Sequence, residues 1–136
     1  MPEFDPVART RTLARIVGPY LIAVAAMVLA RHDHVGALLS AYMQDDVLVL
    51  ATGAFTLMAG LTMVALHHHW TGSSAIVISL IGVIATAKGA WLMIAPGFGS
   101  EMTELVVRSP NLLIIIAGIE FLVGCWLSFV GWRRAP

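Results

Sequence analysis

The amino-acid sequence predicts an all-α membrane protein, a four-transmembrane-helix bundle that forms one transmembrane domain over residues 1–136. Apolar residues make up 59% of the chain and charged residues only 12%, about half the charged fraction of soluble domains. Four apolar runs are long enough to cross about 30 Å of hydrocarbon, at residues 13–30, 47–66, 74–95 and 112–130. The runs lack strand alternation, and helices satisfy their own backbone hydrogen bonds in lipid, so each run is expected to be a helix.

The charge balance and the cysteine count exclude several classes of protein. Eight Lys and Arg residues oppose eight Asp and Glu residues, so the chain lacks the basic surface that nucleic-acid binding needs. The single cysteine, Cys125, excludes an internal disulfide and a cysteine-based zinc site. The expected partner is therefore the lipid bilayer, and no nucleic acid is expected to bind.

Arginines precede the first run and follow the last. The first run also fits a signal peptide, but we expect residues 13–30 to remain as a helix. Positive residues near helix ends favour the cytoplasm. With four alternating spans, the arginines on the side of the termini are Arg9, Arg11, Arg15, Arg133 and Arg134. Arg31 and Arg108 lie on the other side, so both termini are expected to be cytoplasmic.

The connections between the runs differ in length. Residues 67–73 predict a tight cytoplasmic turn. The two outer connections are longer and carry apolar residues at helical spacing, such as Leu38 with Tyr42 and Met102 with Val106. Each predicts a short interfacial helix on the outer side of the membrane. The order span, surface helix, span then occurs twice, which fits either a parallel repeat or the ordinary likeness of two apolar hairpins.

Two charges lie deep within the apolar runs. At 1.5 Å per residue, Lys88 lies about 21 Å from the cytoplasmic end of the third run, and Glu120 about 12 Å from the outer end of the fourth. In antiparallel helices these depths place both charges at nearly the same level. A lone charge there costs at least about 2.5 kcal/mol, so a salt bridge between Lys88 and Glu120 is expected.

This intramembrane charge pair has two interpretations. In the functional one, Glu120 takes up and releases a proton or cation, and Lys88 tunes its affinity. In the structural one, the pair is a static brace, or the lysine side chain extends to the interface. Because a relay needs further polar groups and the spans offer few, the structural interpretation is favoured.

The histidines form two clusters, His32 with His34 and His67 with His68 and His69. Consecutive histidines lack the i, i+3 or i+4 spacing that brings ligands on a helix onto one ion. A weak metal site is therefore one interpretation, and polar caps at helix ends are the favoured one. No histidine lies in mid-span, so a haem between spans is excluded. No catalytic residue, bound metal or cofactor is expected.

Small residues recur along the predicted spans and let helices approach closely in lipid. They predict either a tight bundle or an oligomer interface, and they argue against a wide aqueous pore. The glycines concerned are Gly53, Gly60, Gly82, Gly89 and Gly124.

Three short motifs stand in the first three runs and their connections. Residues 18–21 read Gly-Pro-Tyr-Leu, His67 and Trp70 form a His-x-x-Trp turn, and Lys88 precedes Gly89. Together they resemble an uncharacterised family of small bacterial four-span integral membrane proteins. The resemblance implies a multi-pass protein of the bacterial inner membrane and no particular substrate.

The function expected from these observations is non-enzymatic. We expect the protein to act through helix packing, as an accessory subunit of a membrane complex or as a small homo-oligomer. The alternative is a small transporter or proton-coupled carrier that uses Lys88 and Glu120. A metal or redox-cofactor protein that uses the histidines is the least favoured.

Overall fold

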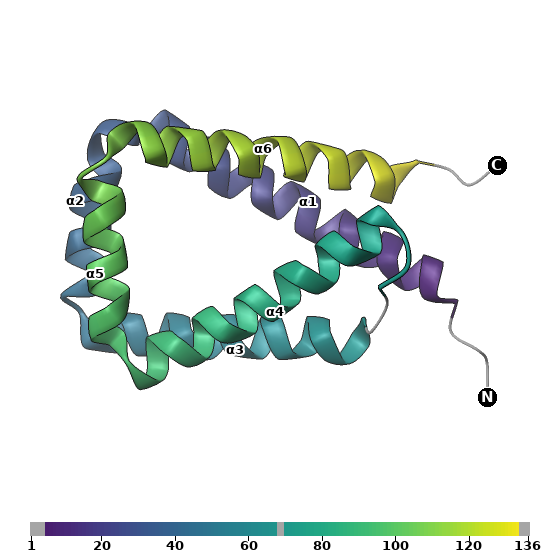
Figure 1. The fold of residues 1–136 in the computed structure, drawn as a ribbon, viewed down its shortest axis with the longest axis horizontal. Helices are drawn as coiled ribbons and strands as arrows, with labels where there is room; N and C mark the ends of the chain where they lie inside the picture. Colours follow the sequence, from purple (N-terminus) through teal and green to yellow (C-terminus); the bar gives the residue numbers. More distant parts are fainter. Residues whose placement is uncertain (1–4, 68–69, 134–136) are drawn as a thin grey trace.

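The computed structural model describes residues 5–67 and 70–133, and every regular element in this part of the chain is a helix. In chain order these are α1 (Pro6–Ala30), α2 (His32–Met43), α3 (Asp46–Leu66), α4 (Ser73–Ile94), α5 (Pro96–Val107) and α6 (Pro110–Trp132) (Figure 1). Four of them, α1, α3, α4 and α6, are long and apolar enough to cross a membrane. The four predicted spans and the two short connecting helices are therefore confirmed as helices.

Capping residues set where the helices begin. Asp5 accepts a hydrogen bond from the backbone N of Val7 at 2.9 Å, so α1 begins well before the apolar run at 13–30. Asp45 caps α3 through the backbone N of Leu48 at 3.0 Å. Hydropathy marks the part of a helix that lies in lipid, whereas caps mark its end. The arginines that precede the first run consequently lie on α1 itself.

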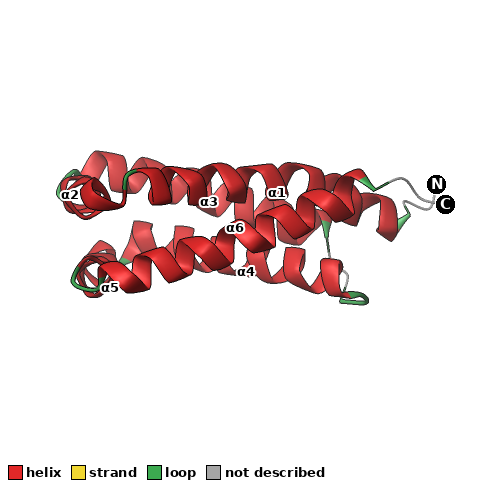
Figure 2. Cartoon of the chain, turned by 90° about the horizontal axis from the view of Figure 1, so that it is seen from above, coloured by secondary structure: helices red, strands yellow, loops and turns green. Residues whose placement is uncertain are grey.

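The spans pack as two antiparallel pairs. α1 packs along α6 and α3 packs along α4, and these two interfaces hold most of the contacts between helices. The pairs meet where α1 contacts α4, at the end of the molecule that holds both termini (Figure 2). At the opposite end, α2 and α5 contact each other and lie across the spans (Figure 1). The four spans thus form the predicted helical bundle, and within it each span has one extensive helical neighbour.

The helix contacts repeat in the two halves of the chain, with α1, α2 and α3 corresponding to α4, α5 and α6. The α1–α6 interface then matches the α4–α3 interface. The contacts α1–α2 and α2–α3 likewise match α4–α5 and α5–α6, and the contacts α1–α4 and α2–α5 join equivalent helices. This pattern is the one expected of a parallel repeat, which is one of the two interpretations that the sequence leaves open.

The hydrophobic core lies near the end that holds both termini. Its buried centre consists of Ala14 and Val17 from α1, Ile78 from α4 and Leu127 from α6. Within the chain, only 17–28% of the hydrophobic window of each span is buried. The rest of the lateral surface is therefore available to lipid or to other helices.

Glycines allow the close approach within both pairs. A Cβ atom added at Gly18 would lie 2.5 Å from Ser128 Oγ, and one at Gly124 would lie 2.9 Å from the carbonyl oxygen of Gly18. In the other pair, a Cβ atom at Gly60 would overlap the backbone of Thr86. The α3–α4 interface also holds Gly53, Gly82 and Gly89. The predicted packing glycines therefore serve contacts inside this chain.

Candidate functional site

A buried polar cluster lies where the two helix pairs meet. His67 follows the last residue of α3 and is 3% exposed. His67 Nε2 lies 2.8 Å from Thr10 Oγ1 on α1, and His67 Nδ1 lies 2.9 Å from Ser79 Oγ on α4. Thr10 and Ser79 are also buried. One imidazole therefore connects three spans, and its hydrogen bonds offset the cost of burying it.

The hydrogen-bond partners set where the protons lie in this cluster. Thr10 Oγ1 lies 2.9 Å from the carbonyl oxygen of Pro6, which has no hydrogen, so the Thr10 hydroxyl donates to that carbonyl. Thr10 Oγ1 then accepts from His67 Nε2. In the neutral imidazole, Nδ1 accepts from the hydroxyl of Ser79.

Two arginines of α1 form hydrogen bonds to the ends of α3 and α6 at this same end of the molecule. Arg9 Nη1 donates to the carbonyl oxygen of Leu66, the last residue of α3, at 3.1 Å. Arg15 Nε donates to the carbonyl oxygen of Gly131 near the end of α6 at 2.7 Å, and its guanidinium lies 5.6 Å from the ring centre of Trp132. Cations at helix C-termini interact favourably with the free carbonyls and the helix dipole. These arginines therefore hold helices together at this end of the molecule.

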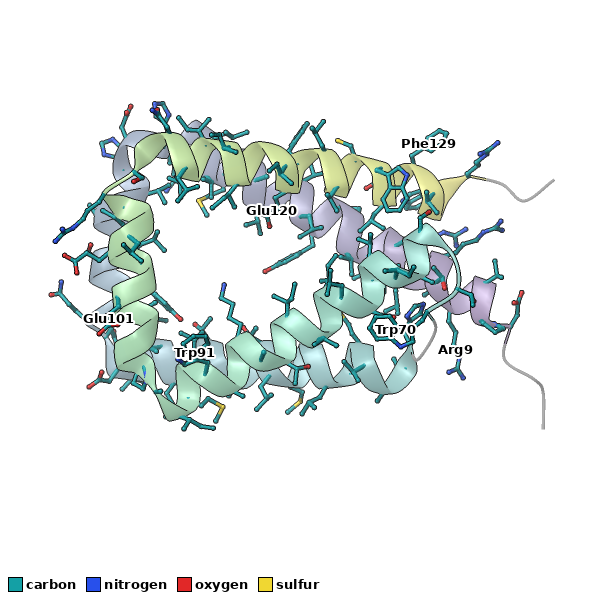
Figure 3. The ribbon with its side chains drawn as sticks, viewed as in Figure 1. Arg9, Trp70, Trp91, Glu101, Glu120 and Phe129 are labelled. Carbon is teal, nitrogen blue, oxygen red and sulfur yellow. The ribbon has the colours of Figure 1, made fainter. Side chains whose placement is uncertain are left out.

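The two intramembrane charges belong to different helix pairs, with Lys88 on α4 and Glu120 on α6. Glu120 is half-buried and lies on the side of α6 that faces the α3–α4 pair (Figure 3). Lys88 is exposed, and its positive charge attracts the Glu120 carboxylate.

The predicted salt bridge between Lys88 and Glu120 is wrong as a direct contact. Counting residues along two helices compared depths in the membrane, but it did not determine the lateral distance between α4 and α6. That distance depends on the pairing of α4 with α3 and of α6 with α1. In the described part of the chain, the contacts within 4.0 Å between basic and acidic side chains are His32–Asp33 at 3.1 Å and the ion pair Glu104–Arg108 at 2.6 Å.

The remaining histidines lie apart from this cluster. His32 and His34 are exposed on α2, and His32 Nε2 lies 3.1 Å from Asp33 Oδ1. Among residues 5–67 and 70–133, no group of three or more His, Cys, Asp or Glu side chains could hold a metal ion. His68 and His69 fall outside the described residues.

Sequence reasoning missed Thr10 and Ser79. A hydroxyl residue is common in a membrane helix, so neither position stood out. Their distances from His67 along the chain, 57 and 12 residues, also hide the contact. The one available signal was that all three residues lie near the membrane face that holds the termini.

These features define a multi-pass α-helical membrane protein with a buried polar cluster around His67 at one end and two charges within its spans. A scan of protein-family models, a search of curated proteins and a search of solved structures find no match to the chain.

Proposed function

We propose that this chain is a bacterial inner-membrane protein without enzymatic activity that acts through helix packing. It would be an accessory subunit of a membrane complex or one copy of a small homo-oligomer. The observation that carries this proposal is the pairing of the spans. Each span packs extensively on one other span, and its second face is uncovered along most of its length. In a bilayer, lipid or a helix of another subunit covers such a face.

The charges within the spans support the same proposal. A charged side chain at the centre of a span costs roughly 2.5–3.5 kcal/mol on the insertion scale. In the single chain, Lys88 is exposed and Glu120 is half-buried, and they attract each other without an ion-pair contact. A neighbouring subunit on these faces would remove both charges from lipid.

The sequence motifs fit this assignment. The Gly-Pro-Tyr-Leu motif at residues 18–21, the turn with His67 and Trp70, and the Lys88–Gly89 pair resemble those of small bacterial four-span membrane proteins. We propose membership of that uncharacterised family on these motifs.

A second candidate, a small transporter or proton-coupled carrier, has one specific observation in its favour. Glu120 and Lys88 lie on helices from different pairs, so movement of one pair against the other would change their separation. Two of the hydroxyls in these spans already have partners, because Thr86 donates to the carbonyl of Gly82 at 2.8 Å and Ser79 contacts His67. Packing therefore remains the first proposal.

The mass of the protein in mild detergent tests the packing proposal. The full chain is extracted from its own membranes, purified, and measured by native mass spectrometry. We expect a mass above the 14.6 kDa of one copy, either as a multiple of the chain or together with a second protein. A single copy without a partner, both in mild detergent and in nanodiscs, would contradict the proposal.

Three variants separate packing from transport: Lys88→Leu, Glu120→Leu and the double variant. Each single variant leaves one charge without its counterpart, so we expect it to accumulate less in the membrane than the double variant. If the protein acts by packing, the double variant keeps the assembled mass. If it is a carrier, the double variant accumulates but loses proton or cation uptake into vesicles. Proton or cation uptake by the wild type that the well-accumulated double variant loses counts against packing.

A further inference from the structure

A cavity of about 480 Å³ lies between the start of α1, the start of α4 and the end of α6. These helix ends lie where both termini lie, with Arg9, Trp70 and Phe129 nearby (Figure 3). Neither Lys88 nor Glu120 lines this cavity. Its volume is within the range of small-molecule sites, which begins at about 300 Å³.

The polar wall of this cavity is cationic. Arg11 and Arg133 line it together with the hydroxyl residues Thr71 and Ser74. In the described part of the chain, neither guanidinium has a carboxylate within 4.0 Å, and that of Arg133 lies 5.9 Å from the ring centre of Phe129. Two guanidinium groups that share a cavity and lack a carboxylate partner are suited to an anion with several oxygens.

Few negative charges compete for these arginines. At this end of the described chain the acidic residue is Asp5, and its carboxylate accepts from the backbone N of Val7 at 2.9 Å. The other arginines nearby, Arg9 and Arg15, donate to backbone carbonyls. The two cavity arginines therefore remain in position for an external anion.

The start of α4 adds to the cationic wall. Its N-cap, Gly72, has φ 97° and supplies no side-chain hydrogen bond. The first bond of the helix runs from Ile76 N to Gly72 O, so the amides before Ile76 have no acceptor within the helix. Ser74 and Ala75 of this first turn line the cavity. Helix N-termini favour phosphate oxygens, and here the effect supplements the two arginines.

The apolar wall of the cavity indicates which anion fits. Phe129 and Val130 lie on α6, a candidate membrane span, and Val7 lies on α1. Trp70 and Trp132 are exposed at the same end, as is typical of residues at the level of lipid headgroups. We propose that this cavity binds the phosphate group of an anionic phospholipid, with the phosphate between Arg11 and Arg133 and the acyl chains along α6.

Native mass spectrometry of the delipidated full chain tests this site. The protein is titrated in detergent with phosphatidylglycerol, and separately with phosphatidylcholine of the same acyl chains. We expect one phosphatidylglycerol molecule to bind at least about tenfold more tightly than phosphatidylcholine. In the double variant Arg11→Gln and Arg133→Gln, that first binding step weakens by about tenfold or more, the effect of one lost charge-assisted hydrogen bond.

Matched variants make the result specific. The double variant Arg31→Gln and Arg108→Gln removes the same charge at the opposite end and is expected to bind as the wild type does. The double variant Arg11→Lys and Arg133→Lys keeps the charge but loses the planar guanidinium groups, which can each donate two hydrogen bonds to one phosphate. Intermediate binding is therefore expected. A thermal unfolding curve of each variant verifies that it is folded.

Equal affinity for the two lipids would overturn the proposal. Wild-type binding by the folded Arg11→Gln and Arg133→Gln variant, or an equal loss in the variant at the opposite end, would overturn it as well. Excess inorganic phosphate is the last arm of the test. If it fails to displace phosphatidylglycerol, the lipid assignment stands. If it displaces the lipid, the site belongs to the free anion and the lipid part of the proposal is wrong.

Discussion

His67 shows how a single residue at the edge of a span can connect several helices. It lies one residue beyond α3, yet it is 3% exposed and bonded to hydroxyls of α1 and α4. A buried imidazole without partners would be strongly unfavourable. The cluster with Thr10 and Ser79 therefore fixes the position at which the two helix pairs meet.

Replacing this imidazole is expected to weaken the junction between the pairs. The variant His67→Ala leaves Thr10 and Ser79 without this partner and creates a cavity, so we expect a loss of about 2 kcal/mol in unfolding free energy. Unfolding in mixed micelles with increasing denaturing detergent measures it. The control is His34→Ala, an exposed position expected to stay within about 0.5 kcal/mol of wild type. Equal stability of the two variants would show that His67 has no bracing role.

At the scale of the helices, pairing depends on how closely two backbones approach. At Gly60 an added methyl would overlap backbone atoms of Thr86, whereas at Gly118 nothing lies within 4 Å of the added atom. Both residues lie inside spanning helices of similar apolar sequence. The difference between them is the neighbouring helix, which the sequence of either span does not contain.

The same substitution at these two glycines is expected to have different effects on stability. Gly60→Ala separates α3 from α4 and lowers the unfolding free energy by about 1–3 kcal/mol. Gly118→Ala gains helix propensity and raises it by up to about 1 kcal/mol, or leaves it unchanged. Both are measured by the detergent unfolding assay. Destabilisation by Gly118→Ala as large as that by Gly60→Ala would contradict the close packing at Gly60.

For the whole molecule, the distribution of charge predicts its orientation in the membrane. Arginines cluster at the end that holds the termini, and most acidic residues lie in the helices and connections at the other end. Lys and Arg favour the cytoplasmic side. The structure places the start of α1 and the end of α6 at one end (Figure 2), as an even number of spans requires, and the arginines predict that this end faces the cytoplasm.

Labelling of single cysteines checks this orientation. In a Cys125→Ser background, one cysteine is introduced at an exposed position at either end of the molecule. The substitutions are Thr71→Cys at the end that holds the start of α4, and Ser40→Cys on α2 at the other end. When only the outer face of the membrane is accessible, we expect an impermeant maleimide to label Ser40→Cys. Thr71→Cys is expected to be labelled only after permeabilisation. The opposite pattern would reverse the orientation, whereas labelling of both positions before permeabilisation would contradict four spans in one orientation.

Much of this architecture follows from local sequence. Apolar runs predict the spans, because burial in lipid depends on the composition of each segment alone. Capping residues such as Asp5 and Asp45 likewise act within a few residues of their position. The candidate site was predicted less completely, because Thr10 and Ser79 become partners of His67 only when three helices meet.

The sequence by itself determined the helices, their number and the side on which the arginines lie. Tertiary structure decided which helices pair, and therefore whether Lys88 reaches Glu120 and whether a glycine faces a neighbour. The physical reason is that lipid stabilises the apolar surface of every span equally, so hydropathy does not distinguish one partner helix from another. Pairing depends on close contact at positions such as Gly18 and Gly60, and that contact exists only in the packed molecule.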